Sequence, residues 1–511
     1  MKFNILSRFK TQFKNHQNEK AFMMTPKMEL YTTVVTWNLN NSFYEKSEDR
    51  LTRLRSLIAK CDPVFVGKLA IYTRTKMHMR SVPLVLVTEL AKMHSGDNLV
   101  AQVTNGVICR ADEITELLAC YEMMNERQGT KKLNRLSKQL QKGLMMAFNK
   151  FDEYQFAKYN RDSAIKFRDA LFLVHPKAKN ELQQDLFDKI AKDTLQTPYT
   201  WETELSALGK VGFDSTETKA IAFRHKWEEL IESNKLGYMA VLRNLRNILE
   251  AGVSYSHIEQ VCDTLTDPAK VIKAKQFPYR YLSAYRELLT ARNVLNDGYT
   301  AELLDALEIA VQISTNTIKG FDQDTHVLLA CDVSGSMQKA VSENSKVLLY
   351  DIGLMLAMLL QARCKNVRVG MFGDIWKTII VPKRNILANV QEFYKREGEV
   401  GYSTNGYRVI EDLLLRKKKM DKIMLFTDCQ LWNSDPASGK DIQSMWLRYK
   451  REVVTDARLY LFDLGGYGQA PLQLLQNEVY LIAGWSDKIF DVLDALEHGG
   501  SALEAIDKIE L

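Results

Sequence analysis

The chain contains, at residues 328–337, the sequence Leu-Leu-Ala-Cys-Asp-Val-Ser-Gly-Ser-Met. A short apolar run here ends in Asp332, which is followed by two hydroxyl residues at alternate positions, Ser334 and Ser336. A buried strand that ends in this way places the three polar side chains in one loop at its carboxyl end. Carboxylate and hydroxyl oxygens are hard ligands of the kind that Mg²⁺ prefers. The stretch therefore predicts a strand followed by a loop that can hold a divalent cation.

Two later segments supply similar oxygen donors. The polar loop Gly401–Gly406 contains Thr404, with Ser403 as an alternative one residue earlier, and the apolar run Met424–Thr427 ends at Asp428. The order of D-x-S-x-S, a loop threonine and a strand-end aspartate resembles the metal-ion-dependent adhesion site of von Willebrand factor A domains. A loop of the same shape without a metal is the alternative. The resemblance implies that the cation, Mg²⁺ or similar, has Asp332, Ser334, Ser336 and Thr404 as direct ligands and Asp428 acting through water.

The C-terminal part of the chain alternates strand and helix patterns. Strands that alternate with helices favour parallel pairing in a doubly wound α/β sheet, in which ligands bind at the carboxyl ends of the strands. We therefore expect residues 321–511 to form a Rossmann-like von Willebrand A domain. The predicted strands are His326–Cys331, Asn366–Phe372, Lys422–Thr427, Arg458–Phe462 and Glu478–Ala483.

Residues 1–320 have a different pattern, with apolar residues at helical spacing and few strand signals. Many helices of moderate length joined by short loops predict a helical-repeat array. The predicted helices include Leu51–Ile58, Leu84–Met93, Ile114–Met124, Leu133–Phe148, Glu181–Ile190, Met239–Leu249 and Tyr281–Leu295.

Composition excludes several classes of protein. The chain has 511 residues, 46% of them hydrophobic and 26% charged, as expected for globular domains. Its seven cysteines include no C-x-x-C pair, which argues against a zinc site or a disulfide framework. No apolar run is long enough to span a membrane. We expect a cytoplasmic protein without a membrane partner.

Charge is distributed unevenly along the chain. Residues 1–150 contain 24 Lys and Arg against 13 Asp and Glu, whereas residues 321–511 contain 23 against 26. A basic N-terminal third could bind phosphate groups, or its lysines could simply cover solvated helix faces. The same choice applies to a basic stripe made of Lys131, Lys132, Arg135, Lys138 and Lys142. The run Arg416–Lys419 is expected to cap the C-terminus of a helix, where cations are favoured.

Four short segments of the N-terminal part resemble the TROVE module of Ro ribonucleoproteins. They are KLAIYTR at 68–74, MRSVPL at 79–84, AVLRNLRN at 240–247 and FPYRYLSAY at 277–285. Together they lie in order ahead of the predicted von Willebrand A domain, so the resemblance covers nearly the whole chain.

The resemblance implies a ring of HEAT-like helical repeats whose ends are bridged by the A domain, in a monomer. It also implies an RNA-binding protein that takes non-coding Y-like RNA on its outer surface. Single-stranded 3′ ends of misfolded RNA would enter a basic central hole, in RNA quality control that could involve an exoribonuclease. A narrow basic hole admits a flexible strand but excludes a duplex.

Nine cationic residues are candidates for RNA contact. Lys158 and His175 match family positions for Y RNA, whereas Asp162 stands near the family's second basic position and Arg161 lies beside it. Arg246 and Arg243 could instead pair with carboxylates inside the repeats. The remaining candidates, from the early helices, are Arg74, Lys76, Arg80 and Arg110.

Two other classes of function compete with RNA binding. One is a metal-dependent protein-binding scaffold, with an adhesion-like A domain and a helical solenoid, that does not bind RNA. The other is an enzyme, which the sequence disfavours because it has no G-x-x-x-x-G-K-[ST] or G-x-S-x-G element and no histidine near the predicted cation loops. We expect a protein that is not an enzyme.

Overall fold

The computed structural model describes residues 13–37, 44–124, 136–160, 162–292, 294, 296–342, 345–433 and 439–511. It divides into two compact units, a sheet unit and a helical unit. The sheet unit comprises the N-terminal segment through Leu54, Phe277–Ser283 and Val311–Ala502, and the helical unit comprises Arg55–Gln276, Ala284–Ala310 and Leu503–Leu511. This division differs from a single boundary at residue 320, because segments from both ends of the chain pack with the other half.

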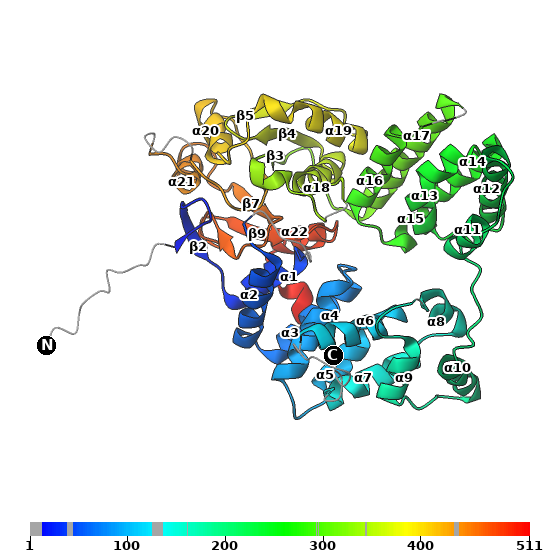
Figure 1. The fold of residues 1–511 in the computed structure, drawn as a ribbon. Coiled ribbons are helices and arrows are strands. Elements are labelled where there is room, and N and C mark those ends of the chain that lie inside the picture. Colours follow the sequence, from blue (N-terminus) through cyan, green and yellow to red (C-terminus); the bar gives the residue numbers. More distant parts are fainter. Residues whose placement is uncertain are drawn as a thin grey trace. The chain divides into compact units, whose positions relative to one another are not determined.

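A mixed six-stranded sheet forms the centre of the sheet unit (Figure 1). Its strand order is β5-β4-β3-β6-β7-β9, and only β5 (Trp376–Ile379) runs antiparallel to its neighbour. The five parallel strands were all predicted from the sequence, because strands buried on both faces appear as continuous apolar runs. They are β3 (His326–Asp332), β4 (Asn366–Phe372), β6 (Lys422–Thr427), β7 (Arg458–Asp463) and β9 (Val479–Ala483).

The connections between strands reverse direction at β3. From β3 the chain passes through α18 (Leu349–Arg363) to β4 on one side, and later crosses to β6 on the other side of β3. Connections of this kind place helices on both faces of a sheet and leave a crevice at the carboxyl ends of the strands where the order reverses. That crevice lies between the ends of β3 and β6. The later helices of this unit are α19 (Ile386–Arg396), α20 (Tyr407–Leu415), α21 (Ile442–Glu452) and α22 (Ile489–Glu497).

The N-terminal segment is attached to the sheet unit by strand pairing and by a buried arginine. Strands β1 (Phe13–Lys14) and β2 (Lys20–Met23) form a small antiparallel sheet with β8 (Gln469–Ala470). The following helix α1 (Pro26–Val35) packs near β9. Arg50, in α2 (Ser47–Lys60), is 2% exposed, and its guanidinium donates hydrogen bonds to the carbonyl oxygens of Thr33, Thr36 and Gly465. These contacts explain why the first 54 residues do not belong to the helical unit.

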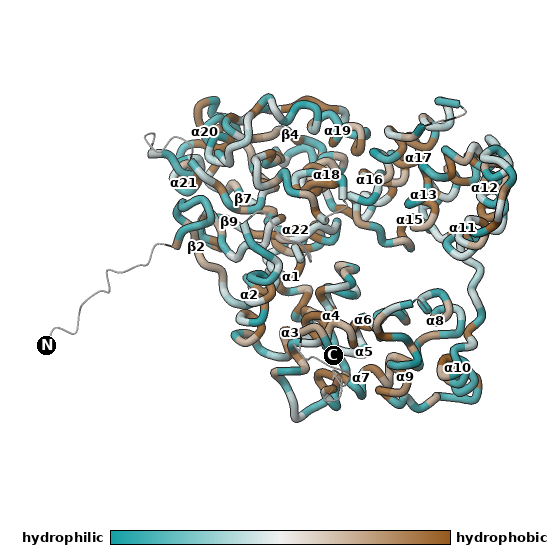
Figure 2. Tube along the Cα trace, viewed as in Figure 1, coloured by the Kyte–Doolittle hydropathy of each residue, from teal (hydrophilic) through white to brown (hydrophobic). Residues whose placement is uncertain are grey.

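The helical unit consists of consecutive helices that pack on their neighbours and on the next helix but one. Helices α3, α4, α5, α6 and α7 contact one another in this way, as do α11 to α14. Figure 2 shows apolar stretches within these helices and hydrophilic stretches in the connections. Such stacking is typical of helical-repeat arrays. The helices that lie wholly in this unit are α3 (Pro63–Thr75), α4 (Ser81–Met93), α5 (Leu99–Val107), α6 (Asp112–Met124), α7 (Lys138–Phe148), α8 (Glu153–Tyr159), α9 (Phe167–Val174), α10 (Glu181–Lys192), α11 (Trp201–Gly209), α12 (Thr216–Glu232), α13 (Tyr238–Ala251), α14 (Tyr255–Thr266), α15 (Pro268–Ala274) and α23 (Glu504–Asp507). Two further helices, α16 (Pro278–Leu289) and α17 (Asp297–Ser314), contain residues of both units.

Within the part of the chain that the structure describes, no helix combines the length and apolar character needed to cross a bilayer.

A glycine allows α7 to approach α5 closely, and this approach can be tested. A Cβ atom at Gly143 would lie 2.4 Å from the Cβ of Thr104 and 2.6 Å from the carbonyl oxygen of Ala101. We predict that Gly143→Ala lowers the free energy of unfolding by about 1–3 kcal/mol through overpacking, although alanine normally favours a helix by about 1 kcal/mol. The control is Gly209→Ala, where a Cβ would meet nothing within 4 Å. Urea unfolding that finds the Gly143 variant as stable as the control would contradict this packing.

Candidate cation site and nucleic-acid interface

Three loops meet at the carboxyl ends of β3 and β6. The backbone N–H of Gly335 donates to the carbonyl oxygen of Tyr402 at 3.0 Å, and that of Trp432 donates to the carbonyl oxygen of Thr404 at 3.0 Å. These two bonds join the loop after β3 and the loop after β6 to the loop at 401–406. The structure thus brings together the three segments that were predicted to hold a cation.

Hydrogen bonds order the side chains of these loops. The Asp332 carboxylate accepts from the Ser334 backbone N–H at 2.9 Å and from the Thr427 hydroxyl at 2.6 Å. The hydroxyls of Ser334 and Ser336 lie 3.4 Å apart, and Asp428 accepts from the backbone N–H of Gln430. All five predicted donors are buried, with at most 4% exposure. We call Asp332, Ser334, Ser336, Thr404 and Asp428 the oxygen cluster.

Two oxygen atoms of this cluster have no hydrogen-bond partner in the described structure. They are Oγ1 of Thr404 and Oδ2 of Asp428, both buried. Buried polar atoms are normally paired, because an unpaired one forfeits its hydration. A hard cation would satisfy both atoms, so the residues fit such an ion. The buried, unpaired hydroxyl of Thr404 favours this residue over Ser403 as the ligand of the loop.

The described residues contain no group of three or more His, Cys, Asp and Glu side chains that could hold a metal. The oxygen cluster has only two carboxylates, and its other donors are hydroxyls. A cation there would depend on hydroxyl ligands, which suits Mg²⁺ rather than a softer metal.

Burial of like charges dominates the electrostatics of the oxygen cluster. Burial, reinforced by the charge of Asp428, raises the pKa of Asp332, and burial also raises the pKa of Asp428. A third buried carboxylate, Asp463 at the end of β7, has its pKa raised by burial to about 7. Sequence reasoning missed Asp463, although it ends a strand in the same way as the predicted aspartates. Without a cation, ionised carboxylates at this edge destabilise the fold.

Three of the predicted RNA-binding arginines converge on two acidic residues at the start of α6. Arg74 is 9% exposed and donates two hydrogen bonds to Glu113, at 2.7 and 3.3 Å. Arg80 and Arg110 each lie 2.9 Å from Asp112. Arg74 is therefore buried and paired inside the helical unit, where it has a structural role. Its contact with an RNA phosphate stays a prediction.

Aromatic rings link Arg110 to the predicted Y RNA position. The Arg110 guanidinium lies 4.3 Å from the ring centre of Tyr159, and the ammonium of Lys158 lies 5.8 Å from the rings of Tyr159 and Tyr154. Lys158 is exposed at the end of α8. Exposed cations beside aromatic rings can contact phosphates and stack on bases. We call Arg110, Tyr154, Lys158 and Tyr159 the tyrosine–cation surface.

The other cationic candidates are dispersed. Lys76 and Arg243 are exposed, His175 is the exposed left-handed residue after α9, and Arg246 is bonded to Glu287. Arg161 lies outside the described residues, as do Lys131, Lys132 and Arg135 of the basic stripe. The remaining stripe residues, Lys138 and Lys142, bond to Gln141 and Asn98. Arg416–Lys419 follow α20 directly, as expected for a helix end.

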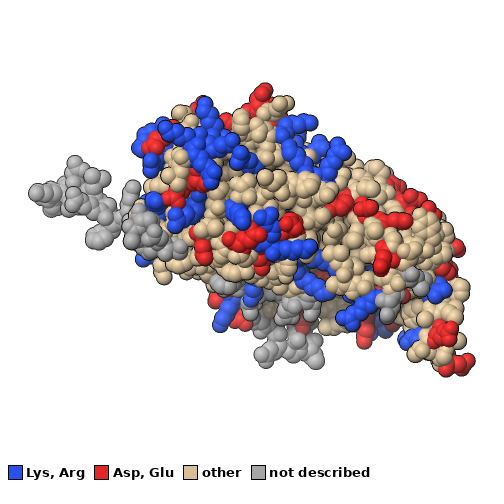
Figure 3. Space-filling model, turned by 90° about the horizontal axis from the view of Figure 1, so that it is seen from above, with Lys and Arg blue, Asp and Glu red and all other residues tan. Residues whose placement is uncertain are grey.

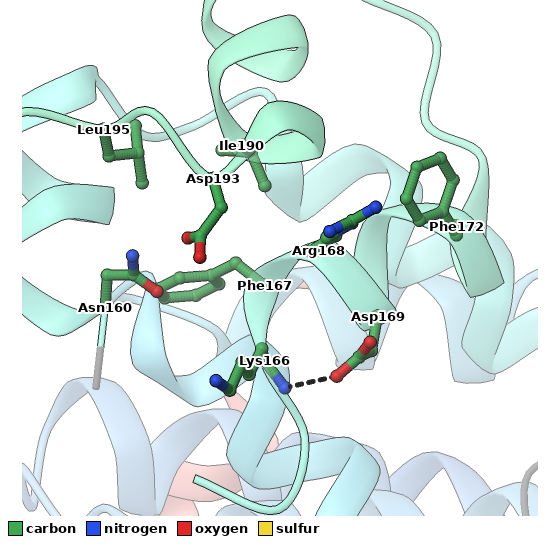
Figure 4. A pocket seen from close by; sticks show the side chains of 9 residues that line it. All are labelled: Asn160, Lys166, Phe167, Arg168, Asp169, Phe172, Ile190, Asp193 and Leu195. Atoms are coloured by element: carbon green, nitrogen blue, oxygen red, sulfur yellow. Dashed lines mark hydrogen bonds between the residues drawn. The ribbon is translucent and has the colours of Figure 1, made fainter. Parts of the chain in front are cut away.

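A pocket of about 390 Å³ lies between α9 and α10 in the same unit (Figure 4). Phe167 and Ile190 are buried at its base, whereas Lys166, Arg168 and the 53% exposed Phe172 are at its rim. Arg168 lies 5.8 Å from the ring of Phe172. The pocket thus repeats the combination of cation and exposed ring found on the tyrosine–cation surface.

The sheet unit also has lysines and arginines on its surface, although residues 321–511 contain more acidic than basic residues. Figure 3 shows Lys and Arg gathered at the end where α20 and α21 lie. Several of these cations are paired along their helices, as Arg416 is with Asp412 and Arg448 with Glu452. Local pairing of this kind makes the surface less basic than its lysine and arginine content suggests.

The buried pair of Arg74 and Glu113 generates a stability prediction. We expect Arg74→Ala to lower the free energy of unfolding by about 3 kcal/mol, because it leaves a buried carboxylate without its main partner. Arg80→Ala is the control, because its side chain is 48% exposed and such surface pairs contribute about 1 kcal/mol or less. Thermal unfolding with equal, small losses for both variants would contradict the structural role of Arg74.

Known proteins resemble this chain in sequence, and a solved structure resembles it in fold. Telomerase protein component 1 of Rattus norvegicus is 24% identical over 311 residues, covering 46% of this chain and 11% of that protein. The Mus musculus protein of the same name is 24% identical over 344 residues, covering 51% of this chain and 12% of that protein. The chain thus spans only about an eighth of these relatives' length.

A solved structure, the Ro (RSR) protein of Deinococcus radiodurans, matches with a TM-score of 0.58 at 15% identity, over 95% of this chain and 100% of that one. This match shows that the two share a fold. The TROVE domain family model matches residues 9–219 and 191–296. Because these matches span more than half of the 511 residues, the chain belongs to the TROVE domain family.

Proposed function

We propose that this chain is a Ro-type RNA-binding protein that acts in RNA quality control or as a ribonucleoprotein scaffold. TROVE proteins are RNA-binding ribonucleoproteins, and the family match is the observation that carries the proposal. The tyrosine–cation surface supports it, because exposed rings beside cations suit unpaired bases and phosphates. The proposed activity is binding rather than catalysis.

We further propose where two kinds of RNA bind. A Y-like RNA would contact the outer surface through Lys158 and His175, with the neighbouring rim residues Arg168 and Phe172. Single-stranded 3′ ends of misfolded RNA would enter the hole of a HEAT-like ring formed by one chain. A partner exoribonuclease would then act on RNA that the ring holds. The packing of α3 to α7, and of α11 to α14, on neighbouring helices supports the repeat architecture.

We propose that the sheet unit is a von Willebrand A domain whose oxygen cluster holds Mg²⁺ or a similar ion. Asp332, Ser334, Ser336 and Thr404 would be direct ligands, and Asp428 would act through water. The orphan oxygens of Thr404 and Asp428 support this assignment. When bound, such an ion supplies an open position for an oxygen ligand of a partner.

RNA binding can be tested by fluorescence anisotropy with one structured RNA, with and without a single-stranded 3′ tail. We expect tighter binding of the tailed RNA, and affinity that falls as salt rises because phosphate contacts release counterions. The double variant Lys158→Glu and Arg168→Glu should bind about ten-fold more weakly and show a smaller salt slope. Lys273→Glu on α15 is a control for a single charge reversal.

The same titration distinguishes the alternative function, a metal-dependent protein-binding scaffold. RNA binding that persists after chelation favours the Ro-type function. No RNA binding at low salt would contradict it. Protein binding alone, abolished by Asp332→Ala, would then favour the scaffold.

The cation site predicts a pH-dependent response to Mg²⁺. Because the pKa values of Asp332 and Asp428 are raised in the fold, the contribution of these two groups to stability without a cation is greatest below the ordinary aspartate pKa of about 4. That contribution is lost as pH rises through the folded pKa values. Mg²⁺ binds the ionised form, so it should raise the melting temperature more at about pH 8 than at about pH 5. Asp332→Asn should remove the difference. An Mg²⁺ effect that is equal at both pH values and in the variant would exclude this site.

A further inference from the structure

The pocket between α9 and α10 is lined by charges of both signs, and two of these charges are unpaired. The Asp169 carboxylate is used at the start of α9, where it accepts from the backbone N–H of Lys166 at 2.9 Å. The Lys166 ammonium lies 3.0 Å from the carboxylate of Asp162, which does not line the pocket. Among the residues that the structure describes, neither the Arg168 guanidinium nor the Asp193 carboxylate has a hydrogen-bond or ion-pair partner. The pocket therefore offers a cation and a carboxylate to a ligand.

The end of α10 holds Asp193 at the pocket. Asp193 is the left-handed residue after this helix, with a φ of 55°, and its backbone N–H donates to the carbonyl oxygen of Ile190 at 3.2 Å. Glycine and asparagine are the usual residues in this conformation, so the backbone does not require a carboxylate here. Figure 4 shows the Asp193 carboxylate pointing towards the ring of Phe167, beside the amide of Asn160.

A cation and an exposed ring stand on the α9 side of the pocket. The Arg168 guanidinium points towards Phe172 and lies 5.8 Å from the centre of its ring, which is 53% exposed (Figure 4). A ring with this exposure offers a face on which a planar base can stack, and the guanidinium beside it can bind a phosphate. The volume of about 390 Å³ is within the range of small-molecule sites, about 300–1,000 Å³. The pocket thus has the size and the groups that a nucleotide needs.

The carboxylate of Asp193 favours one base over the others. An ionised carboxylate only accepts hydrogen bonds, and it can accept two side by side through its two oxygens. Guanine presents two adjacent donors on its pairing edge, the N1–H and the N2 amino group. Adenine and cytosine present one amino group beside an acceptor nitrogen, and uracil presents one N–H between two carbonyl oxygens. A carboxylate in this position therefore matches guanine and disfavours the other three bases.

We propose that the pocket between α9 and α10 binds a guanine nucleotide, with the base stacked on Phe172, its two donors bonded to Asp193 and its phosphate bonded to Arg168. The nucleotide is an unpaired guanosine of RNA or a free guanosine phosphate, because the same groups recognise both. For its RNA ligand the inference rests on the proposed function, and it adds to that function a pocket and a base preference.

Calorimetric titration of the full chain with guanosine 5′-monophosphate and with adenosine 5′-monophosphate tests the proposal. We expect the guanosine nucleotide to bind about ten-fold more tightly, as a bidentate contact to a base provides. Asp193→Asn should remove this preference, because an amide has only one acceptor oxygen, and asparagine keeps the left-handed backbone. Asp185→Asn is the matched control: it removes the same charge from an exposed position of α10 outside the pocket lining, and it should keep the preference. Phe172→Ala should weaken both nucleotides equally, since stacking does not depend on the base.

A second titration distinguishes the two sources of guanine and separates the pocket from the proposed function. It uses a single-stranded RNA with one guanine and the same RNA with adenine in its place. A guanine preference in RNA that Asp193→Asn removes supports the pocket as an RNA site. A preference for free guanosine 5′-monophosphate without any RNA binding supports the pocket as a nucleotide site and contradicts the proposed function alone. Equal binding of the two free nucleotides, no binding of either, or a preference that survives in Asp193→Asn overturns the pocket, and RNA binding by the same protein would then stand without it.

Discussion

Two strand-end carboxylates, Asp332 and Asp428, are buried together where β3 pairs with β6. The parallel pairing fixes this proximity, because it aligns the carboxyl ends of neighbouring strands at one edge of the sheet. Like charges buried at one edge are unfavourable unless they are protonated or neutralised by a cation. Hydrogen bonds from neighbouring groups partly offset this cost. The Thr427 hydroxyl bonds Asp332, the backbone N–H of Gln430 bonds Asp428, and two backbone N–H groups bond the third carboxylate, Asp463.

In the helical unit, a buried charge is paired with a charge of opposite sign. Its most deeply placed predicted cation, Arg74, is used to stabilise the start of α6 through Glu113. Two exposed cations, Lys158 and Arg168, lie beside aromatic rings. Phosphate contact supplies affinity and ring stacking tolerates any base, so this combination suits single-stranded or extruded nucleotides. The two units thus carry separate proposed binding sites of different chemistry.

Features of the fold and the site that depend on a local pattern of residues were predictable from the sequence. The five parallel strands were predictable because their apolar runs are continuous, and the oxygen cluster because strand ends share an edge. The antiparallel β5 was missed because it has only four residues, of which only Ile379 is buried.

Long-range partners were not predictable. Nothing near Arg74 in the sequence indicates that Glu113 is its partner. The pairing of β2 with β8 was not predictable for the same reason, because it depends on the folded surface rather than on chain order. Net charge by region was also a poor guide, since it does not show which lysines and arginines are paired along a helix.

Photo-crosslinking of the full chain to a structured Y-like RNA containing 4-thiouridine, followed by peptide mapping, tests the account most directly. The account predicts crosslinks in the helical unit, at peptides that carry Tyr154, Tyr159 or Phe172, whether or not a chelator is present. Crosslinks confined to residues 321–511, or crosslinks that disappear on chelation, would contradict RNA binding by the TROVE helices.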